Sequence, residues 1–131
     1  MAFQLSVVTP ERAVLETEAR SVVFPAHDGQ IGILRDRAPL LCKLGIGELR
    51  ADMPKGSRRF FIDGGFAQVV HNNLIILTQE AVPAEKLDAE TARTELADAI
   101  AVSAPTLETQ EKRSRDQARA RAKLRILSRG S

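Results

Sequence analysis

The residues best suited to metal binding or nucleophilic chemistry are few in this sequence of 131 residues. It contains two histidines, His27 and His71, and one cysteine, Cys42. A nucleophilic cysteine needs a base and an orienting third group, and a structural zinc site needs about four ligands of such types. Both histidines lie in turn-like segments, and Cys42 follows two leucines, as a small core residue does. We therefore expect no active site, no metal and no cofactor, in a protein that is not an enzyme.

Three glycine-containing stretches resemble nucleotide-binding loops in composition only. They lie at 28–32, 45–47 and 64–65. In a phosphate-binding loop the glycines lead into a helix or are followed by Gly-Lys-Ser/Thr, and none of these stretches meets that condition. We interpret them as turns, bulges or close-packing positions.

Charge is concentrated at the end of the sequence. Basic and acidic residues balance over 1–84, whereas 85–111 carries a net charge of −5 and 112–131 one of +7. Charge of this density favours a partner over an isolated solvated helix. The basic residues lie four apart in two ridges, so that each ridge occupies one side of a helix. The ridges are Arg115, Arg119 and Lys123, and Arg121, Arg125 and Arg129.

Three interpretations of this basic segment are open: a solvated helix face, a nucleic-acid-binding arm and a surface for an acidic protein. The chain has no tyrosine or tryptophan and no aromatic residue after Phe66. The segment therefore offers no platform on which bases could stack, although its charge could hold phosphates without sequence preference. A small β-sandwich protein with a basic arm for nucleic acid is the alternative function.

The elements that would position these residues fall into two parts of an α+β chain. Alternation at Phe3, Leu5 and Val7 is typical of a half-buried strand, and similar short segments separated by turns follow it. Many short strands at regular spacing predict an antiparallel sandwich or barrel. We expect strands near 3–7, 12–17, 20–24, 30–34, 48–53, 58–63, 66–71 and 74–78.

A helical period replaces this pattern after residue 84. Asp88 is a good N-cap for a first helix with small residues on one face, and Pro105 separates it from a second helix over 106–128. Alanine side chains bury little apolar area, and exposed ion pairs contribute about 0–1 kcal/mol each. We therefore expect a helical hairpin that can detach or open.

Nothing in the sequence predicts export or membrane insertion. The first residues lack a charged region followed by an apolar one, and no apolar run approaches the ~20 residues needed to span a bilayer. We expect a cytosolic protein that meets a membrane only through a partner.

Five segments carry a resemblance to a known family in their order and spacing. They are VVTPER at 7–12, VVFPAHDGQIGIL at 22–34, APLL at 38–41, DGGFAQV at 63–69 and LIILTQEAV at 74–82. Together they resemble the epsilon subunit of the F-type ATP synthase. The resemblance implies a sandwich of about ten strands over 1–84, followed by a two-helix hairpin over 85–131.

The resemblance also implies a role and its partners. The sandwich would bind the gamma subunit of the central stalk and the ring of c subunits. The hairpin would reach the alpha and beta subunits of the catalytic head and restrain ATP hydrolysis. Such a subunit couples proton or other ion transport to ATP synthesis, without catalysis of its own. It is peripheral, on the cytoplasmic face of the bacterial inner membrane.

Residue roles follow from the same resemblance. Gln30, Arg35 and Arg37 would face the rotor ring, although the family commonly has an acidic residue at the place of Gln30 and Pro-Gly-His at 35–37. The head contacts would be the cations of the second helix. These are Arg113, Arg115, Arg119, Arg121, Lys123 and Arg125.

Some family members bind ATP through an Ile/Leu-Asp-x-x-Arg-Ala motif at the hairpin. The matching residues here are Leu87, Asp88 and Ala92, with Thr91 at the place of the arginine. The missing guanidinium removes a strong charge-assisted donor to phosphate. This departure argues against an ATP site.

Overall fold

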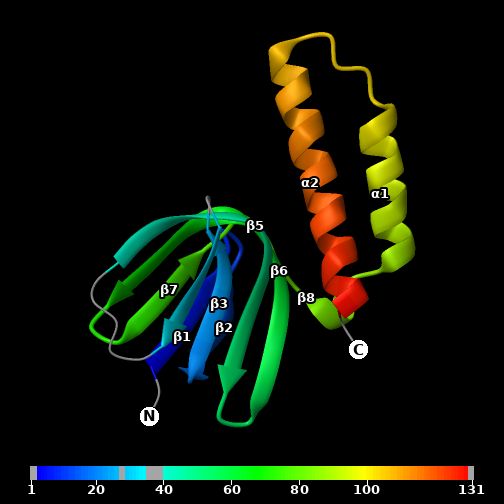
Figure 1. The fold of residues 1–131 in the computed structure, drawn as a ribbon. Coiled ribbons are helices and arrows are strands. Elements are labelled where there is room, and N and C mark those ends of the chain that lie inside the picture. Colours follow the sequence, from blue (N-terminus) through cyan, green and yellow to red (C-terminus); the bar gives the residue numbers. More distant parts are fainter. Residues whose placement is uncertain (1–2, 27–28, 35–39, 130–131) are drawn as a thin grey trace.

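The computed structural model describes residues 3–26, 29–34 and 40–129, which form a β-sandwich with a helical hairpin beside it (Figure 1). The strands are β1 (Phe3–Val8), β2 (Ala13–Ala19), β3 (Ser21–Ala26), β4 (Gly29–Leu34), β5 (Leu40–Met53), β6 (Gly56–Val70), β7 (Asn73–Leu77) and β8 (Ala81–Pro83). After them come the 3-10 turn η1 (Ala84–Lys86) and the helices α1 (Ala89–Ala101) and α2 (Leu107–Arg129).

The strands pair in the order β2-β1-β7-β6-β5-β3-β4, and β8 pairs with β6. The expected antiparallel arrangement holds for every pair but one, because β1 and β7 run parallel. Alternate side chains of the strands meet in one core between the layers. Its largest fully buried members include Leu5, Phe24, Leu49, Phe60 and Ile62.

The expected count of about ten strands is not confirmed, since the described residues form eight. The difference lies in β5 and β6, which are 14 and 15 residues long. We expected separate strands at 58–63 and 66–71, but β6 is continuous, and its free side pairs first with β8 and then with β7. The sequence interpretation also missed 40–47 and β8. Counting each half of β5 and β6 as a strand would bring the eight to ten.

A glycine pair in the middle of β6 reverses which side chains face the core. Phe60 and Ile62 point inward before the pair, and Ala67 and Val69 do so after it. Gly64 and Gly65 have φ angles of +67° and +106°, in the left-handed region that favours glycine. This change of alternation leaves an aromatic residue outside the core on each side of the pair.

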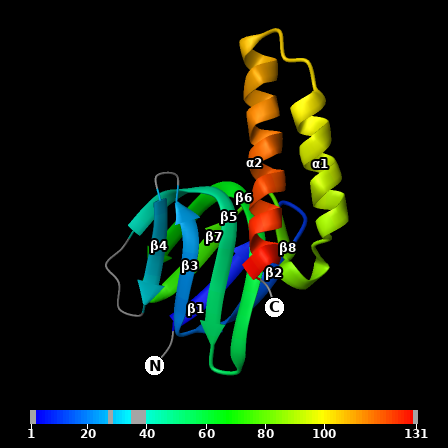
Figure 2. The same ribbon diagram turned by 45° about the vertical axis from the view of Figure 1, so that its right-hand side comes forward.

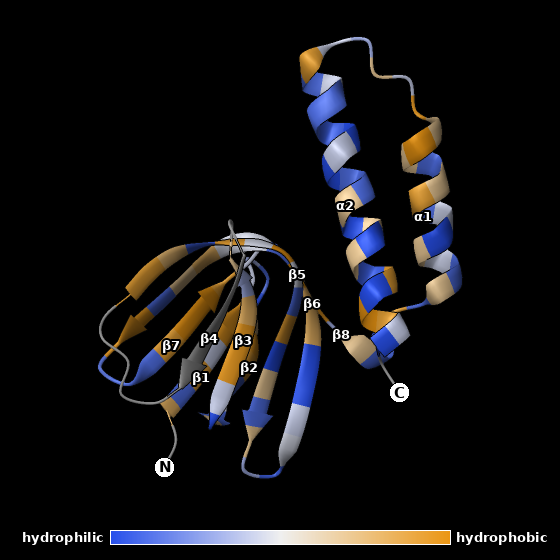
Figure 3. Ribbon diagram, viewed as in Figure 1, coloured by the Kyte–Doolittle hydropathy of each residue, from blue (hydrophilic) through white to orange (hydrophobic). Residues whose placement is uncertain are grey.

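The helices begin and end where their sequence signals indicate. The Asp88 side chain accepts hydrogen bonds from the amides of Glu90 and Thr91, as an N-cap does. Pro105 lies between the two helices. α2 stands on the β5–β6–β8 side of the sandwich, with α1 beside it (Figure 2). Most of α2 is hydrophilic along its length (Figure 3).

The two histidines and the cysteine were predicted to be turn and core residues. His71 is exposed and, with Asn72, forms the two-residue turn between β6 and β7, at φ angles of 50° and 63°. Cys42 is half-buried against the core. His27 lies outside the described residues. Among the described helices, none is both long and apolar enough to cross a membrane.

Candidate functional site

The first candidate surface is the outer side of β5, β6 and β8, on which α2 lies. Phe61 is fully buried there, although it points away from the main core. It packs in a separate cluster with Ala122 and Ile126 of α2, and Ile46 and Val82 line the same cluster. We call Ile46, Phe61 and Val82 the covered face. Because α2 contributes only two buried side chains to it, the apolar area that holds the helix in place is small.

Polar contacts supply much of the remaining attachment of α2. The Arg119 guanidinium donates to the Asp63 carboxylate at 2.7 Å, and the Arg59 Nη2 atom donates to the Ile126 carbonyl at 2.6 Å. Lys123 lies 5.1 Å from the centroid of the Phe61 ring. These groups are partly exposed, so we expect the attachment to respond to salt.

Three of the side-chain hydrogen bonds between the two helices end on carbonyls at the end of α1. Arg113 donates to the Ala99 and Ile100 carbonyls at 3.2 and 2.9 Å, and Gln117 reaches the Ala99 carbonyl at 3.4 Å. The last turn of α1 contains no basic residue of its own. Arg113 therefore supplies the positive charge and the donors that the end of a helix favours.

The structure separates the predicted head-contact residues into two groups. Arg113, Arg119 and Lys123 are engaged within the chain, since Lys123 also forms an ion pair with Glu95 at 3.2 Å. Arg115, Arg121 and Arg125 are exposed. Only the second group is available to a partner while α2 remains on the covered face.

The predicted ATP-site residues have structural roles in this arrangement. Leu87 packs against the Phe61 cluster, and Ala92 is buried in α1. The hydroxyl of Thr91 donates to the Asp88 carboxylate at 2.6 Å. This bond and the Glu90 amide hold the pKa of Asp88 below its ordinary value of 3.8. The carboxylate is thus already occupied by capping, and ATP binding stays an untested prediction.

The predicted ring-contact residues are only partly visible. The backbone of Gln30 belongs to β4 and pairs with Pro25 of β3. Arg35 and Arg37 lie outside the described residues. Within the described ranges, no three His, Cys, Asp or Glu residues gather in a way that could hold a metal ion.

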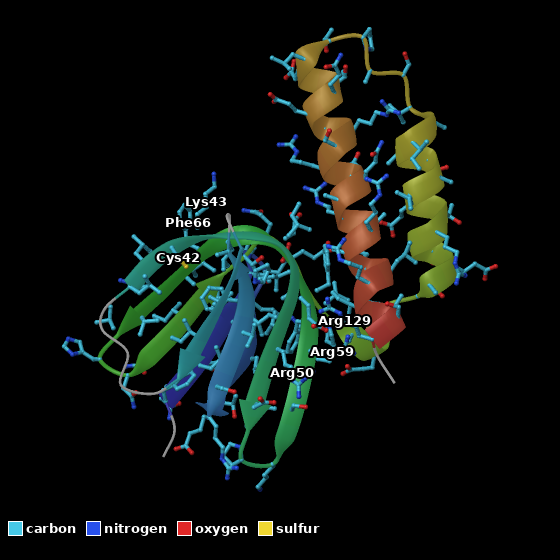
Figure 4. The ribbon with its side chains drawn as sticks, viewed as in Figure 1. Cys42, Lys43, Arg50, Arg59, Phe66 and Arg129 are labelled. Atoms are coloured by element: carbon cyan, nitrogen blue, oxygen red, sulfur yellow. The ribbon has the colours of Figure 1, made fainter. Side chains whose placement is uncertain are left out.

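A second surface, which the sequence interpretation missed, lies on the outer side of β5, β6 and β7. Leu41, Phe66 and Leu77 are 69%, 51% and 49% exposed, and Phe66 pairs with Lys43 on one side and Leu77 on the other. Figure 4 shows Lys43 and Phe66 together at this edge of the sandwich. We call Leu41, Lys43, Phe66 and Leu77 the open face. The aromatic residue after the glycine pair was the one available signal.

A groove adjoins the open face. It has a volume of about 310 Å³ and is bordered by Phe66, Leu77 and the Val8–Pro10 segment, with more apolar than polar lining. An exposed apolar cluster beside a groove is characteristic of a protein-binding surface.

Comparison with known proteins identifies the family. Residues 2–84 match the family described as ATP synthase, Delta/Epsilon chain, beta-sandwich domain. The chain belongs to the ATP synthase epsilon family. An ATP synthase epsilon chain of Rhodopirellula baltica is 41% identical over 125 residues, which cover 95% of this chain and 98% of that protein. This match extends well beyond the sandwich and includes the hairpin.

Other relatives broaden the range of this family. An epsilon chain of a Synechococcus strain is 35% identical and covers 100% of this chain and 97% of its own length. The epsilon chain of Propionigenium modestum, described as sodium ion specific, is 33% identical over 71% of this chain and 68% of its own. The fold also matches a chain in the mitochondrial ATP synthase of Euglena gracilis. The TM-score is 0.84 and the identity 22%, over 92% of this chain and 78% of that one.

Proposed function

We propose that this chain is the rotor subunit of the central stalk that couples ion translocation to ATP synthesis. The observation that carries the proposal is the match to an epsilon chain along 95% of the sequence. Residues 1–84 would bind gamma and the c ring, the latter through Gln30, Arg35 and Arg37, and residues 85–131 would act on the alpha and beta subunits. The protein would have no catalytic activity and would be peripheral, on the cytoplasmic face of a bacterial inner membrane.

The open face is our candidate for the gamma contact. The face presents Phe66 paired with Leu77, and Leu41, which is exposed opposite Gln68 of β6. Its extent and the groove beside it suit a partner helix with apolar side chains, since such grooves accept an amphipathic helix by its apolar face. Its position on rigid strands also suits a contact that must transmit torque.

The hairpin is our candidate for restraint of hydrolysis. Arg115, Arg121 and Arg125 are exposed while α2 is docked, and release of the hairpin from the sandwich would add Arg119, which is paired with Asp63 in the docked state. An acidic surface of the catalytic head would compete with Asp63 for Arg119. Docking on the sandwich and docking on the head would then exclude one another.

The first experiment is a pull-down with purified gamma, followed by ATPase assays of the assembled catalytic complex. We expect gamma to bind both the full chain and a version that ends at Ala84, and hydrolysis to be faster with the truncated version. Equal rates would remove the restraint and keep the coupling role. Absence of gamma binding would refute the assignment, and salt-dependent binding of free DNA would then favour the nucleic-acid alternative.

Truncation uncovers Phe61, so a full-length variant is the sharper test of restraint. Arg115, Arg121 and Arg125 changed together to Glu should raise ATP hydrolysis without disturbing the docked hairpin. The matched control carries the same charge reversals at Arg12, Arg20 and Lys55, which are exposed on the sandwich. Equal hydrolysis rates for the two triple variants would contradict a role for the α2 cations.

A further inference from the structure

The carboxyl-terminal turn of α2 is held by a residue of the sandwich. The last four carbonyls of a helix have no partner within it, and that end carries a partial negative charge. Ile126 lies in this turn, and its carbonyl accepts the 2.6 Å hydrogen bond from Arg59 of β6. Arg59 therefore caps a helix to which it does not belong.

Glu48 of β5 connects this arginine to the last residue of α2. One carboxylate oxygen accepts from the Arg59 Nε atom, and the other forms an ion pair with Arg129 at 3.3 Å. The Glu48 side chain is only 12% exposed. Figure 4 shows Arg59 and Arg129 near one another at the junction between the sandwich and the end of α2. We call Glu48, Arg59 and Arg129 the charge clamp.

The contacts within the hairpin are separate from this clamp. In the described residues, the side-chain hydrogen bonds and ion pairs that leave α1 end on α2, through Arg113, Gln117 and Lys123, apart from those to its N-cap Asp88. The clamp lies at the opposite end of α2 from Arg113. The clamp shares no charged residue with the contacts within the hairpin, and Lys123, which lies over the Phe61 ring, has its ion-pair partner Glu95 within the hairpin.

We propose that the charge clamp sets the docking equilibrium of α2 on the covered face and releases the hairpin as an intact unit. Without the Glu48 carboxylate, two guanidinium groups would face each other with no anion between them. The like charges would then push the end of α2 away from β6. The inference names a regulatory device for the arm, and it rests on the proposed function only for its consequence in the complex.

The test uses the full chain with pairs of spin labels, in a Cys42→Ala background whose fold is checked by circular dichroism. A label pair at Lys55→Cys and Ser114→Cys reports docking of α2 on the sandwich. A second pair, at Arg93→Cys and Ser114→Cys, reports closure of the hairpin. All three labelled sites are exposed. Pulsed electron resonance then gives each distance distribution and the populations within it.

Glu48→Gln and Arg59→Gln should each raise the ratio of undocked to docked chains roughly tenfold, as expected for loss of a charged hydrogen bond. The hairpin distance should not change. Arg59→Lys should raise the ratio of undocked to docked chains almost as much, because an ammonium cannot bridge the Ile126 carbonyl and the Glu48 carboxylate as a guanidinium does. In the parent chain, salt raised from about 0.05 to 0.5 M should move the docking distance in the same direction.

Two matched controls remove the same charges nearby. Glu85→Gln removes a carboxylate that is paired with Arg58, and Arg50→Gln removes an arginine that lies opposite Arg59 in the strand pair and bonds Asp52. Both should leave the docking distance unchanged. If Glu48→Gln and Glu85→Gln gave equal fractions of undocked chains, the proposed role of the charge clamp in docking would be wrong. A hairpin that opens together with undocking would overturn its release as one unit.

Failure of this inference can be distinguished from failure of the proposed function. The distances are measured on the isolated chain, without gamma or ATP, so they do not depend on the role in the complex. If the clamp holds and Glu48→Gln leaves ATPase activity in the complex unchanged, it is the proposed restraint of hydrolysis that is wrong.

Discussion

Phe61 and Phe66 lie on the same strand, both point away from the core, and they differ in what covers them. Phe61 is fully buried under α2, whereas Phe66 is 51% exposed on the open face. The two faces are parts of one surface of β5 and β6, separated by the Gly64–Gly65 pair. Phe66 faces outward because the alternation of β6 changes at this pair, whereas Phe61 faces outward before the change.

The difference lies in the chemistry of what each face accepts. The covered face is paired with a hydrophilic helix through two buried side chains and several charged groups. The open face combines exposed apolar residues with Lys43 and a groove, and no described segment of the chain lies over it. One β-sandwich thus has one face covered by its own helix and one that is exposed.

The largest expected effect would come from a substitution in the glycine pair that separates the two faces. Gly65→Ala would place a Cβ atom 1.8 Å from the Leu77 carbonyl oxygen, at a φ angle of +106°. We expect a loss of more than about 4 kcal/mol of folding free energy, or failure to fold, measured by urea unfolding. Gly64→Ala is the control, because its Cβ would meet nothing within 4 Å. Its φ of +67° should cost about 1–2 kcal/mol. Equal losses would show that the close approach to β7 is unimportant.

The next effect should fall on the covered face alone. Phe61→Ala removes the centre of the cluster that holds Ala122 and Ile126. We expect the docked α2 to lose about 3 kcal/mol of stability. The loss should appear as faster hydrogen exchange in α2, with little change in the strands of the main core. Phe66→Ala should change folding stability by less than about 0.5 kcal/mol. Similar destabilisation by both substitutions would remove the distinction between the two faces.

In gamma binding, unlike in folding stability, Phe66→Ala should have a larger effect than Phe61→Ala. Phe66→Ala should weaken gamma binding by about 2 kcal/mol, roughly 30-fold in Kd, if Phe66 is the central residue of that contact. Titration calorimetry with purified gamma would measure it. Phe61→Ala should leave the Kd unchanged, as should Ser57→Ala at an exposed position at the other end of the same strand. Equal Kd values for the parent chain and Phe66→Ala would place gamma elsewhere.

Local signals in the sequence predicted much of the fold and the elements of the arm. Asp88 as an N-cap and Pro105 as a break act within a few residues, so the bounds of α1 and α2 followed closely. The continuity of β6 did not follow, because glycines normally read as the end of a strand. Here the long ladder with β5 carries the strand through them.

Which cations of α2 are bonded within the chain and which are exposed could not be predicted from their spacing. Arg119 and Arg115 stand in the same ridge, yet one is bonded to Asp63 and the other is exposed. Their roles depend on how α2 is rotated on the sandwich, which Phe61 and Ile126 fix through contacts between residues far apart in the chain. The pairing of Arg59 with the Ile126 carbonyl is of the same kind.

The smallest expected effect distinguishes the arm from the sandwich by its response to acid. Hydrogen bonds from the Thr91 hydroxyl and the Glu90 amide lower the pKa of Asp88, and a hydrogen bond from Lys112 lowers that of Asp116. A carboxyl with a lowered pKa in the folded state stabilises it above the unfolded pKa, and this contribution is lost as pH falls through the folded value. The helical circular dichroism signal should therefore begin to fall below about pH 4.

Asp88→Asn separates the charge from the cap, because asparagine caps helices as well as aspartate does. The variant should keep its helical signal at neutral pH, and the fall of that signal at low pH should be smaller than in the parent chain. Asp98→Asn, at an exposed position of α1, should show the same fall as the parent chain. An acid transition identical in the parent chain and in Asp88→Asn would mean that the covered face, and not the cap, loosens first. That outcome would move the acid sensitivity of the arm from the start of α1 to the docking contacts of α2.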